Sequence, residues 1–294
     1  MPERLELIAT TIRGLEDVAA MEIRELLGRE VKAHLGRVRW YGSWEDVVRA
    51  NYLARSIHRG IVVLAKGTFE TLEDIGKLFE DIDYTEFVSP TQTFGVVTKR
   101  FGVHEFTSVD VSRVVGSAVV KSFLRSTGVK LRANLDEPDL RVRVYVIGRE
   151  VFGGIDTTGD IGLHRRNYRV YNHPAALKTT IAYSLVRLSG WKRDESLLDP
   201  MCGGGTIPIE AALYGRDVPP GALRKTPYAF LKLRFGAELS ETLGEVREVA
   251  QGDPTVDLDI RGCDISEKHV SGAIKNAESA GVLDTIKFST CDAR

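Results

Sequence analysis

The sequence predicts an α/β protein with more than one domain, whose last part belongs to the doubly wound parallel class. The first reason is size, because 294 residues with 43% hydrophobic content can build two or three cores. The second is that short apolar strands alternate with helix-like segments along the chain. The third is a glycine turn at 203–205 that joins a buried strand to a helix, as at the start of a doubly wound domain.

Residues 1–65 are predicted to form a ferredoxin-like α+β region. A strand over 5–12 is followed by a helix that ends at Gly28, where apolar residues recur at helical spacing. The strand-like stretch GRVRWYGS, a helix over 44–55 and the β-branched stretch GIVVLAKG come next. Two strand–helix repeats closed by a strand form a small α+β unit, and it contains no recognisable catalytic group.

Residues 66–155 are predicted to form a second α+β region with a basic surface. Its strand over 93–102 ends in Lys99 and Arg100, and Ser108 is expected to cap the following helix. Polar and basic side chains recur every four residues on one face of that helix, opposite a face of valines. The basic face consists of Arg113, Ser117, Lys121 and Arg125.

A strand over 141–148 adds to this basic surface. Side chains alternate along a strand, so Arg141, Arg143 and Tyr145 are expected on one face, with valines on the other. Between residues 87 and 172, Lys and Arg outnumber Asp and Glu. Cations beside an aromatic plane are typical of a surface that binds RNA phosphates and bases. An ordinary solvated face has the same composition, so the pattern leaves both interpretations open.

Residues 156–175 show little periodicity and are predicted to be a linker. The segment contains Arg165 and Arg166 among aromatic and other basic residues. It is therefore a candidate for RNA contact, or a loop that merely packs between domains. A helix from Pro174 is expected to open the C-terminal domain, residues 176–294.

The glycine turn lies in the sequence SLLDPMCGGGTIPIEAAL. A dinucleotide site would need a third glycine where Pro208 stands, and a Walker A site would need a Gly-Lys-Ser/Thr sequence that is absent. Asp199 precedes the turn and would repel a pyrophosphate, whereas a carboxylate suits a ligand with an amine and a sulfonium. These features favour S-adenosylmethionine over NAD or ATP.

Two further acids lie at the ends of later strands. Asp264 ends a strand that begins at 258 and is placed to accept from ribose hydroxyls. Asp292, in a strand-like stretch over 286–293, is placed to accept from an adenine amine. Helix capping explains any one acid, but it is a weaker explanation for all three. The predicted cofactor residues are Asp199, Cys202, Gly203, Gly204, Gly205, Thr206, Asp264, Ile265, Asp292 and Ala293. The long insertion before Asp264 is expected either to cover the site or contact substrate, or to elaborate the surface.

Composition argues against several classes of protein. No run of about 18 apolar residues occurs, so no membrane span is expected, and the polar start lacks the apolar stretch of a signal peptide. The three cysteines, Cys202, Cys263 and Cys291, include no CxxC pair. We therefore expect neither a disulfide framework nor a zinc site, no bound metal, and a cytoplasmic location.

In combination, these motifs resemble RNA guanine-N2 methyltransferases with an N-terminal ferredoxin-like region and a THUMP domain. The resemblance covers nearly the whole chain. It rests on ATTIRGLEDVAAMEIREL, KRFGVHEFTSVDVSRVVG, GDIGLHRRNYRVYNHPAALKTTIA, LLDPMCGGGTIPIEAAL, GCDIS and CDAR. The implied architecture is a ferredoxin-like α+β region and a THUMP domain, followed by a partial Rossmann-like methyltransferase domain.

The resemblance also implies a function. It implies S-adenosylmethionine-dependent methylation of a guanine N2 amine in RNA, usually tRNA, with the THUMP domain positioning the RNA. The candidate RNA contacts are Lys99, Arg100, Arg113, Lys121, Arg125, Arg141, Arg143, Arg165 and Arg166.

The sequence departs from the family at the catalytic motif. The expected Asn/Asp-Pro-Pro-Tyr/Phe sequence would lie downstream of Asp292, and this sequence ends at Arg294. We therefore assign no catalytic residue and expect no methyl transfer by this chain alone, without the missing segment or a companion chain. Two alternatives stay open: a non-catalytic RNA-binding THUMP protein with a vestigial methyltransferase fold, and a ribosomal RNA guanine-N2 methyltransferase.

Overall fold

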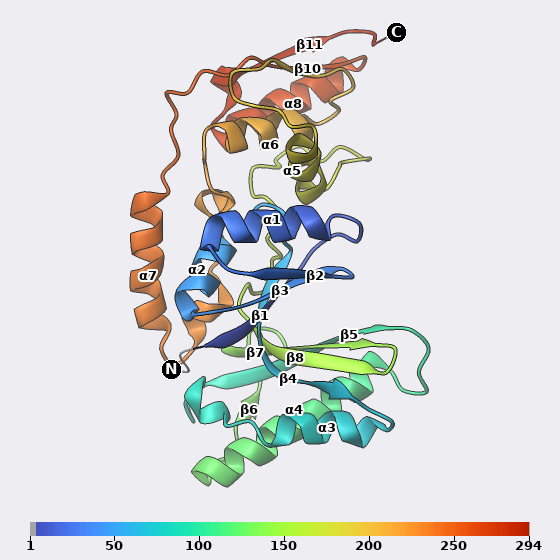
Figure 1. Cartoon of the computed structure of the whole chain (residues 1–294), viewed down its shortest axis with the longest axis vertical. Helices are drawn as coiled ribbons and strands as arrows, with labels where there is room; N and C mark the ends of the chain where they lie inside the picture. The colour runs from blue at the N-terminus through green and yellow to red at the C-terminus, as the bar shows by residue number, and fades with distance from the viewer. Residues whose placement is uncertain (1–3, 294) are drawn as a thin grey trace.

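The computed structural model describes residues 4–293, which form an elongated molecule with the C-terminal domain at one end of the long axis (Figure 1). The strands are β1 (Leu5–Thr10), β2 (Val31–His34), β3 (Arg37–Gly42), β4 (Arg59–Thr68), β5 (Thr93–Phe101), β6 (Arg132–Ala133), β7 (Leu140–Ile147), β8 (Glu150–Asp156), β9 (Leu197–Asp199), β10 (Ile260–Asp264) and β11 (Ile286–Thr290). The α-helices are α1 (Glu16–Leu27), α2 (Trp44–Leu53), α3 (Leu72–Glu80), α4 (Ser108–Thr127), α5 (Thr179–Leu188), α6 (Thr206–Gly215), α7 (Gly236–Val249) and α8 (Glu267–Ala280). The 3-10 helices are η1 (Tyr84–Glu86), η2 (Pro220–Leu223), η3 (Ala229–Lys232) and η4 (Leu283–Thr285).

The first two regions share one eight-stranded sheet with strand order β2-β3-β1-β4-β8-β7-β5-β6. β4 pairs antiparallel with β1 on one side and with β8 on the other, so it runs through the predicted boundary after residue 65. On α4, Val111, Val115 and Val119 are fully buried, as their spacing predicts. A single apolar cluster spans both regions, which therefore form one platform.

Two helix starts differ from the predictions. Thr107, one residue before the predicted Ser108, caps α4 through a capping box with Asp110. Helix α5 begins at Thr179 and not at Pro174. Between these two positions, Ala175 donates its backbone N–H to Nδ1 of His173, and the Leu177 carbonyl accepts from Arg169.

The long insertion leaves the C-terminal domain and returns to the platform, where α7 lies beside α2 (Figure 1). The ring of Phe235 contacts Trp44 edge-on, with centroids 4.8 Å apart. Arg234 donates its backbone N–H to the carbonyl of Phe87 over 2.8 Å. We call residues 227–249 the strap, because they fasten the C-terminal domain to the platform. The sequence predicted that the insertion would either cover the site or contact substrate, or elaborate the surface. Packing against the platform was not among these predictions.

The C-terminal domain contains a three-stranded parallel sheet in the order β11-β10-β9, with α6 and α8 packed on it. The register pairs Asp199 with Gly262, and Asp264 with Thr290. The carboxyl ends of the three strands therefore meet at one edge, where doubly wound domains bind ligands. Among the described residues, β9 and β11 are the two edge strands, and Leu198 of β9 is 63% exposed.

One expectation from the cysteine pattern is wrong. The structure joins Cys263, in β10, and Cys291, just after β11, by a disulfide. The two residues are 28 positions apart in the sequence, but neighbouring strands bring their Cα atoms to 5.7 Å. Spacing along the chain does not reveal such a pair. Among residues 4–293, the helices are too short or too polar to cross a membrane.

Candidate functional site

The glycine turn is a tight loop held between β9 and β10. Cys202 donates its backbone N–H to the Cys263 carbonyl over 2.8 Å, and Gly205 donates back to Cys202 over the same distance. Gly203 and Gly205 have φ of 52° and 78°, a region that side chains disfavour. A Cβ on Gly205 would also lie 2.9 Å from the side chain of Ala273. The turn therefore needs glycine both for its backbone shape and for close packing on α8.

Asp264 is the best-organised acid at this edge of the sheet. Its carboxylate accepts hydrogen bonds from the backbone N–H of Gly203 at 3.0 Å and of Ser266 at 2.9 Å. Although burial works in the opposite direction, these N–H groups and His269 lower the pKa of Asp264. The group is therefore an anion that the glycine loop and the start of α8 hold in one orientation.

Asp199 and Cys202 show that the field at this edge is negative. Burial raises the pKa of Asp199, and the charge of Asp264 adds to the shift. Burial, followed by the charges of Asp199 and Asp264, raises the pKa of the Cys202 thiol to about 12. Burial is the largest cause of both shifts, and the neighbouring anions that add to them mark a place where a cation is favoured. These residues fit a ligand that carries a sulfonium and an amine, and not one that carries a pyrophosphate.

The linker covers the glycine turn. This contact was not predicted from the sequence. Asn276 of α8 is almost fully buried and accepts N–H groups from Val170 and Tyr171. Its amide donates to the carbonyls of Tyr171 and Gly204. A Cβ on Gly203 or Gly204 would meet the ring or the Cβ of His173 within 3.5 Å. The signal available in the sequence was a polar Asn on the apolar face of a helix.

Other predicted cofactor residues lie at the same edge of the sheet. Ile265 is 69% exposed beside Asp264, and Thr206 begins α6 directly after the turn. Asp292 and Ala293 follow β11 and are exposed. The structure therefore gathers the predicted set around the strand ends, while the contact of each residue with a cofactor stays a prediction. Among residues 4–293, no group of three His, Cys, Asp or Glu side chains is arranged to hold a metal ion.

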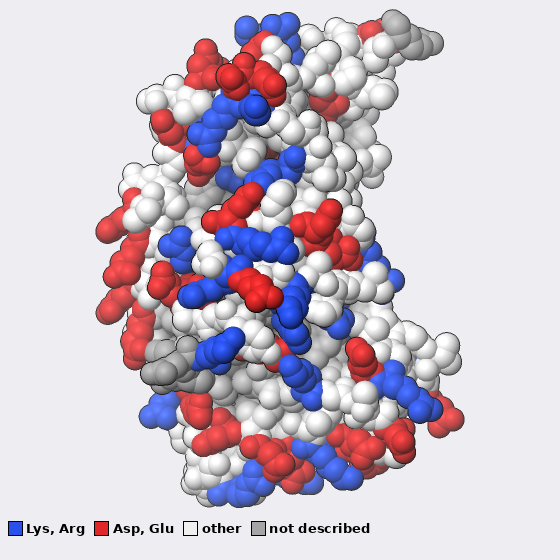
Figure 2. All heavy atoms as spheres, viewed as in Figure 1, with Lys and Arg blue, Asp and Glu red and all other residues white. Residues whose placement is uncertain are grey.

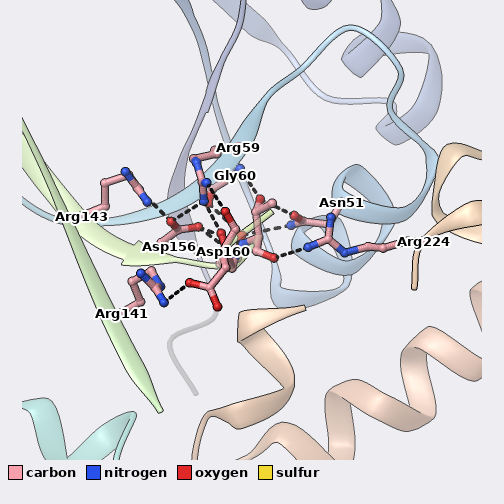
Figure 3. Close-up of polar contacts among 11 residues, drawn as sticks. Asn51, Arg59, Gly60, Arg141, Arg143, Asp156, Asp160 and Arg224 are labelled. Atoms are coloured by element: carbon pink, nitrogen blue, oxygen red, sulfur yellow. Dashed lines mark hydrogen bonds and ion pairs between the residues drawn. The ribbon is translucent and has the colours of Figure 1, made fainter. Parts of the chain in front are cut away.

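Three arginines predicted to bind RNA are buried instead, and Figure 3 shows two of them, Arg141 and Arg143. Arg143 donates to the fully buried Asp156 over 2.7 Å, and Arg141 pairs with Asp160. Arg166 lies 3.5 Å from the buried Glu210 of α6. The alternation along β7 was predicted correctly, but β7 lies inside the sheet and the loop after β8 covers its polar face. We therefore do not retain Arg141, Arg143 and Arg166 as RNA contacts.

The basic face of α4 is exposed, but each of its three cations has a carboxylate within 4.0 Å. Arg113 pairs with Asp110 at 3.0 Å and Lys121 with Glu80 at 3.5 Å. Arg125 lies 3.9 Å from Asp81. A largely apolar groove of about 540 Å³ runs beside this face, between α4 and β5. Intrahelix and neighbouring acids reduce the net positive field here, so the predicted RNA contact on α4 stays a prediction.

The remaining predicted cations lie nearer the linker. Lys99 and Arg165 are exposed. Arg100 is half-buried and its guanidinium lies 2.9 Å from Nδ1 of His104. On the face seen in Figure 2, acidic side chains gather over α7, while both signs are mixed over the lower part of the platform. An acidic α7 disfavours RNA along the outer side of the strap.

Comparisons with known proteins agree with this geometry. Residues 6–59 match the RlmL ferredoxin-like domain, residues 69–156 the THUMP domain, and residues 166–294 the family described as RMKL-like, methyltransferase domain. The tRNA (guanine(6)-N2)-methyltransferase of Methanocaldococcus jannaschii is 44% identical over 98% of this chain and 76% of its own length. The protein of the same name from Archaeoglobus fulgidus is 42% identical over 97% of this chain and 69% of its own length.

A solved structure has the same arrangement. SMU.472, described as a putative methyltransferase complexed with SAH, superposes with a TM-score of 0.87 at 27% identity. The match covers 99% of this chain and 76% of that one. Fold and site together define a methyltransferase with an RNA-binding THUMP domain. The chain belongs to the family of RNA methyltransferases in which a ferredoxin-like region and a THUMP domain precede an RMKL-like methyltransferase domain.

Proposed function

We propose that the protein methylates the exocyclic N2 amine of a guanine in tRNA, at position 6, with S-adenosylmethionine as the methyl donor. The observation that carries the proposal is the near-full-length similarity to two proteins named for that reaction, at 44% and 42% identity. The negative field around the glycine turn is an independent support, because the proposed donor is cationic at its reactive end.

The predicted cofactor residues would each hold a different part of the cofactor. Bound S-adenosylmethionine supplies an electrophilic methyl group on its sulfonium. Asp264, already held by two backbone N–H groups, has further lone pairs that can accept from the ribose hydroxyls. Asp199 would hold the cationic amine and sulfonium, and Asp292 would accept from the adenine amine. The glycines allow the backbone to approach the ligand closely.

Orientation is the main contribution that a protein makes to such a transfer. Holding the amine nitrogen in line with the methyl–sulfur bond removes much of the entropic barrier. A guanine in a paired stem would first have to be turned out of the helix, which costs a few kcal/mol. A rigid platform, joined to the C-terminal domain by the strap, suits this task because it fixes where the RNA lies relative to the cofactor.

A cytoplasmic location and a companion chain stay predictions under this proposal.

A second candidate substrate is ribosomal RNA. A protein named ribosomal RNA large subunit methyltransferase K/L, from Pseudoalteromonas atlantica, is 31% identical, but the match covers 41% of its length. The higher identity and fuller coverage of the tRNA enzymes favour tRNA.

A deletion strain tests the proposal directly. Mass spectrometry of its purified tRNA should show loss of N2-methylguanine at position 6, with ribosomal RNA unchanged. If the modification persists in tRNA and disappears from ribosomal RNA, the second candidate is correct. Calorimetry with the purified chain tests the cofactor separately, since S-adenosylhomocysteine should bind and NAD should not.

A further inference from the structure

Six basic side chains from separate segments meet where the platform joins the linker. They lie at the start of β4, at the end of β5, in the linker and directly before α5. We call this set the junction cluster: His58, Arg59, Lys99, His164, Arg165 and Lys178. The rings of His58 and His164 are tilted against each other with centroids 4.4 Å apart. Nε2 of His58 lies 3.1 Å from the Thr180 hydroxyl, so the cluster reaches the first turn of α5.

The acids that could neutralise the cluster are already used. Asp156 accepts from Arg59 at 2.9 Å and from Arg143 at 2.7 Å, and from the backbone N–H groups of Thr158 and Gly159 (Figure 3). Asp160 pairs with Arg141. Within residues 4–293, the side chains of Lys99, Arg165 and Lys178 have no carboxylate within 4.0 Å. Positive charge is therefore left over at this point.

The pKa values of groups in the cluster indicate the same excess of positive charge. Burial, with His164, Lys178, Lys99 and Arg166 adding to it, lowers the pKa of His58 to about 3. Burial, with Arg165, Lys178, Arg59 and Arg166, lowers the pKa of His164 to about 4. The pKa of Lys99 is also lowered, first by burial and then by Arg143, Arg59 and Lys178, with Asp156 acting in the opposite sense. Burial is the largest cause of these shifts, and the neighbouring cations that add to them mark a place where an anion is favoured.

The position of the cluster connects the platform to the cofactor loop. The Thr179 hydroxyl donates to the His164 carbonyl over 2.8 Å. A few residues along the linker, Arg169 donates both to the Leu177 carbonyl and to the hydroxyl of Thr206, which follows the glycine turn. A polyanion lying on the cluster would thus run between the sheet of the platform and the cofactor pocket. On α4, by contrast, each cation has an acid beside it.

We propose that the junction cluster binds the phosphate backbone of the RNA substrate and directs the strand from the platform toward the cofactor loop. The proposal rests on the proposed function, because it assigns to that reaction a docking point for its RNA. Lys99, Arg165 and Lys178 supply the charge, while Arg59 is paired with Asp156. The two histidines are neutral at pH 7 and supply N–H donors and ring surface.

Salt-dependent binding tests the proposal. The probe is a fluorescent tRNA transcript, and its affinity for the full chain is measured from about 50 to about 200 mM salt. In the triple variant Lys99→Gln, Arg165→Gln, Lys178→Gln, the slope of log K against log salt should become less steep by about two to three, at roughly 0.7–0.9 for each lost phosphate contact. The control triple variant Lys32→Gln, Lys192→Gln, Lys287→Gln removes the same charge elsewhere and should keep the wild-type slope.

Two further readouts make the outcome decisive. Calorimetry with S-adenosylhomocysteine should give the same affinity for the junction variant as for the wild type, which shows that the chain is folded. The variant Lys99→Arg, Lys178→Arg keeps the charge and should keep the slope. An unchanged slope in the triple junction variant would refute RNA binding by the junction cluster, and the proposed function would still stand. Failure of the wild type to bind tRNA at low salt would overturn the proposed function and the cluster together.

Discussion

The glycine turn and the junction cluster lie in one molecule and have opposite electrostatic character. At the turn, Asp199 and Asp264 contribute to raising the pKa of the Cys202 thiol to about 12. At the cluster, cations contribute to lowering the pKa of His58 to about 3. Burial is the largest cause at both places, so the sign of the neighbouring charges is what separates them. A cationic cofactor and an anionic RNA would thus each meet the field that favours it.

The linker contributes residues to both places. It contributes His164 and Arg165 to the cluster, and Tyr171 and His173 to the cover of the glycine turn. The junction cluster also differs from the buried arginines in its acidic partners. The buried Arg141, Arg143 and Arg166 lie beside carboxylates. Lys99, Arg165 and Lys178 are exposed and have no carboxylate within 4.0 Å among residues 4–293.

Removing the charge of Asp156, the buried acid that pairs with Arg59 of the junction cluster, should have the largest effect on stability. Asp156→Asn leaves the guanidinium groups of Arg59 and Arg143 without their buried counter-charge. Breaking a buried ion pair in this way typically costs about 3–5 kcal/mol, so the melting temperature should fall by roughly 10 °C. Asp160→Asn is the matched control, because Asp160 is largely exposed and should contribute about 1 kcal/mol or less. Equal losses for both variants would refute the structural role given to Asp156.

Neutralising the best-organised acid of the pocket should weaken cofactor binding. Asp264→Asn keeps the shape but removes a charged acceptor, which is worth about 1.5–3 kcal/mol or roughly 10- to 150-fold in affinity. Calorimetry with S-adenosylhomocysteine measures the change. Asp194→Asn, an exposed acid outside the pocket, should bind as the wild type does. A change of less than twofold in this affinity for Asp264→Asn would contradict the role of Asp264 in cofactor binding.

The histidine pair should make the protein less stable in acid. Both folded pKa values, about 3 and about 4, lie below the 6.5 of an ordinary histidine. The unfolded chain therefore binds more protons, so stability is complete above about pH 6.5 and is lost as the pH falls toward 4. Because the rings are partly exposed, we expect a total of only about 1–2 kcal/mol. Urea unfolding at pH 7 and pH 5 should show a smaller loss for His58→Gln, His164→Gln than for the wild type. An equal loss would mean that these histidines do not titrate as described.

The smallest effect concerns the thiol of Cys202. A pKa near 12 leaves few thiolates at pH 8, so alkylation of the folded protein by iodoacetamide should be slow. Asp199→Asn removes one neighbouring charge and should speed the reaction a few-fold, since burial remains the larger cause. Mass spectrometry of the labelled peptide measures the rate. No acceleration in this variant would mean that the negative field is not felt at the turn.

Local patterns in the sequence predicted the parts of the site that depend on neighbours along the chain. The strand, glycine turn and helix at 197–215, and the acid at the end of β10, follow from period, turn chemistry and strand polarity. The position of Lys99 near the end of a strand also follows from the local pattern, whereas its contact with RNA stays a prediction.

Features that depend on distant contacts could not be predicted in this way. Arg141 and Arg143 alternate as expected, but their burial depends on a loop that closes over β7 after the chain has returned in β8. The strap packs on a helix almost two hundred residues earlier, through contacts such as that between Phe235 and Trp44. Pairing of Cys263 with Cys291 likewise depends on the register of two strands.

A cross-over binding measurement tests the central claim most directly. The affinities for tRNA and for S-adenosylhomocysteine are measured on two variants, Asp264→Asn and the triple Lys99→Gln, Arg165→Gln, Lys178→Gln. The account predicts that the first loses the cofactor and keeps tRNA, whereas the second loses tRNA and keeps the cofactor. If either variant weakens both ligands equally while its melting temperature is unchanged, the two fields do not serve separate ligands and the account is wrong.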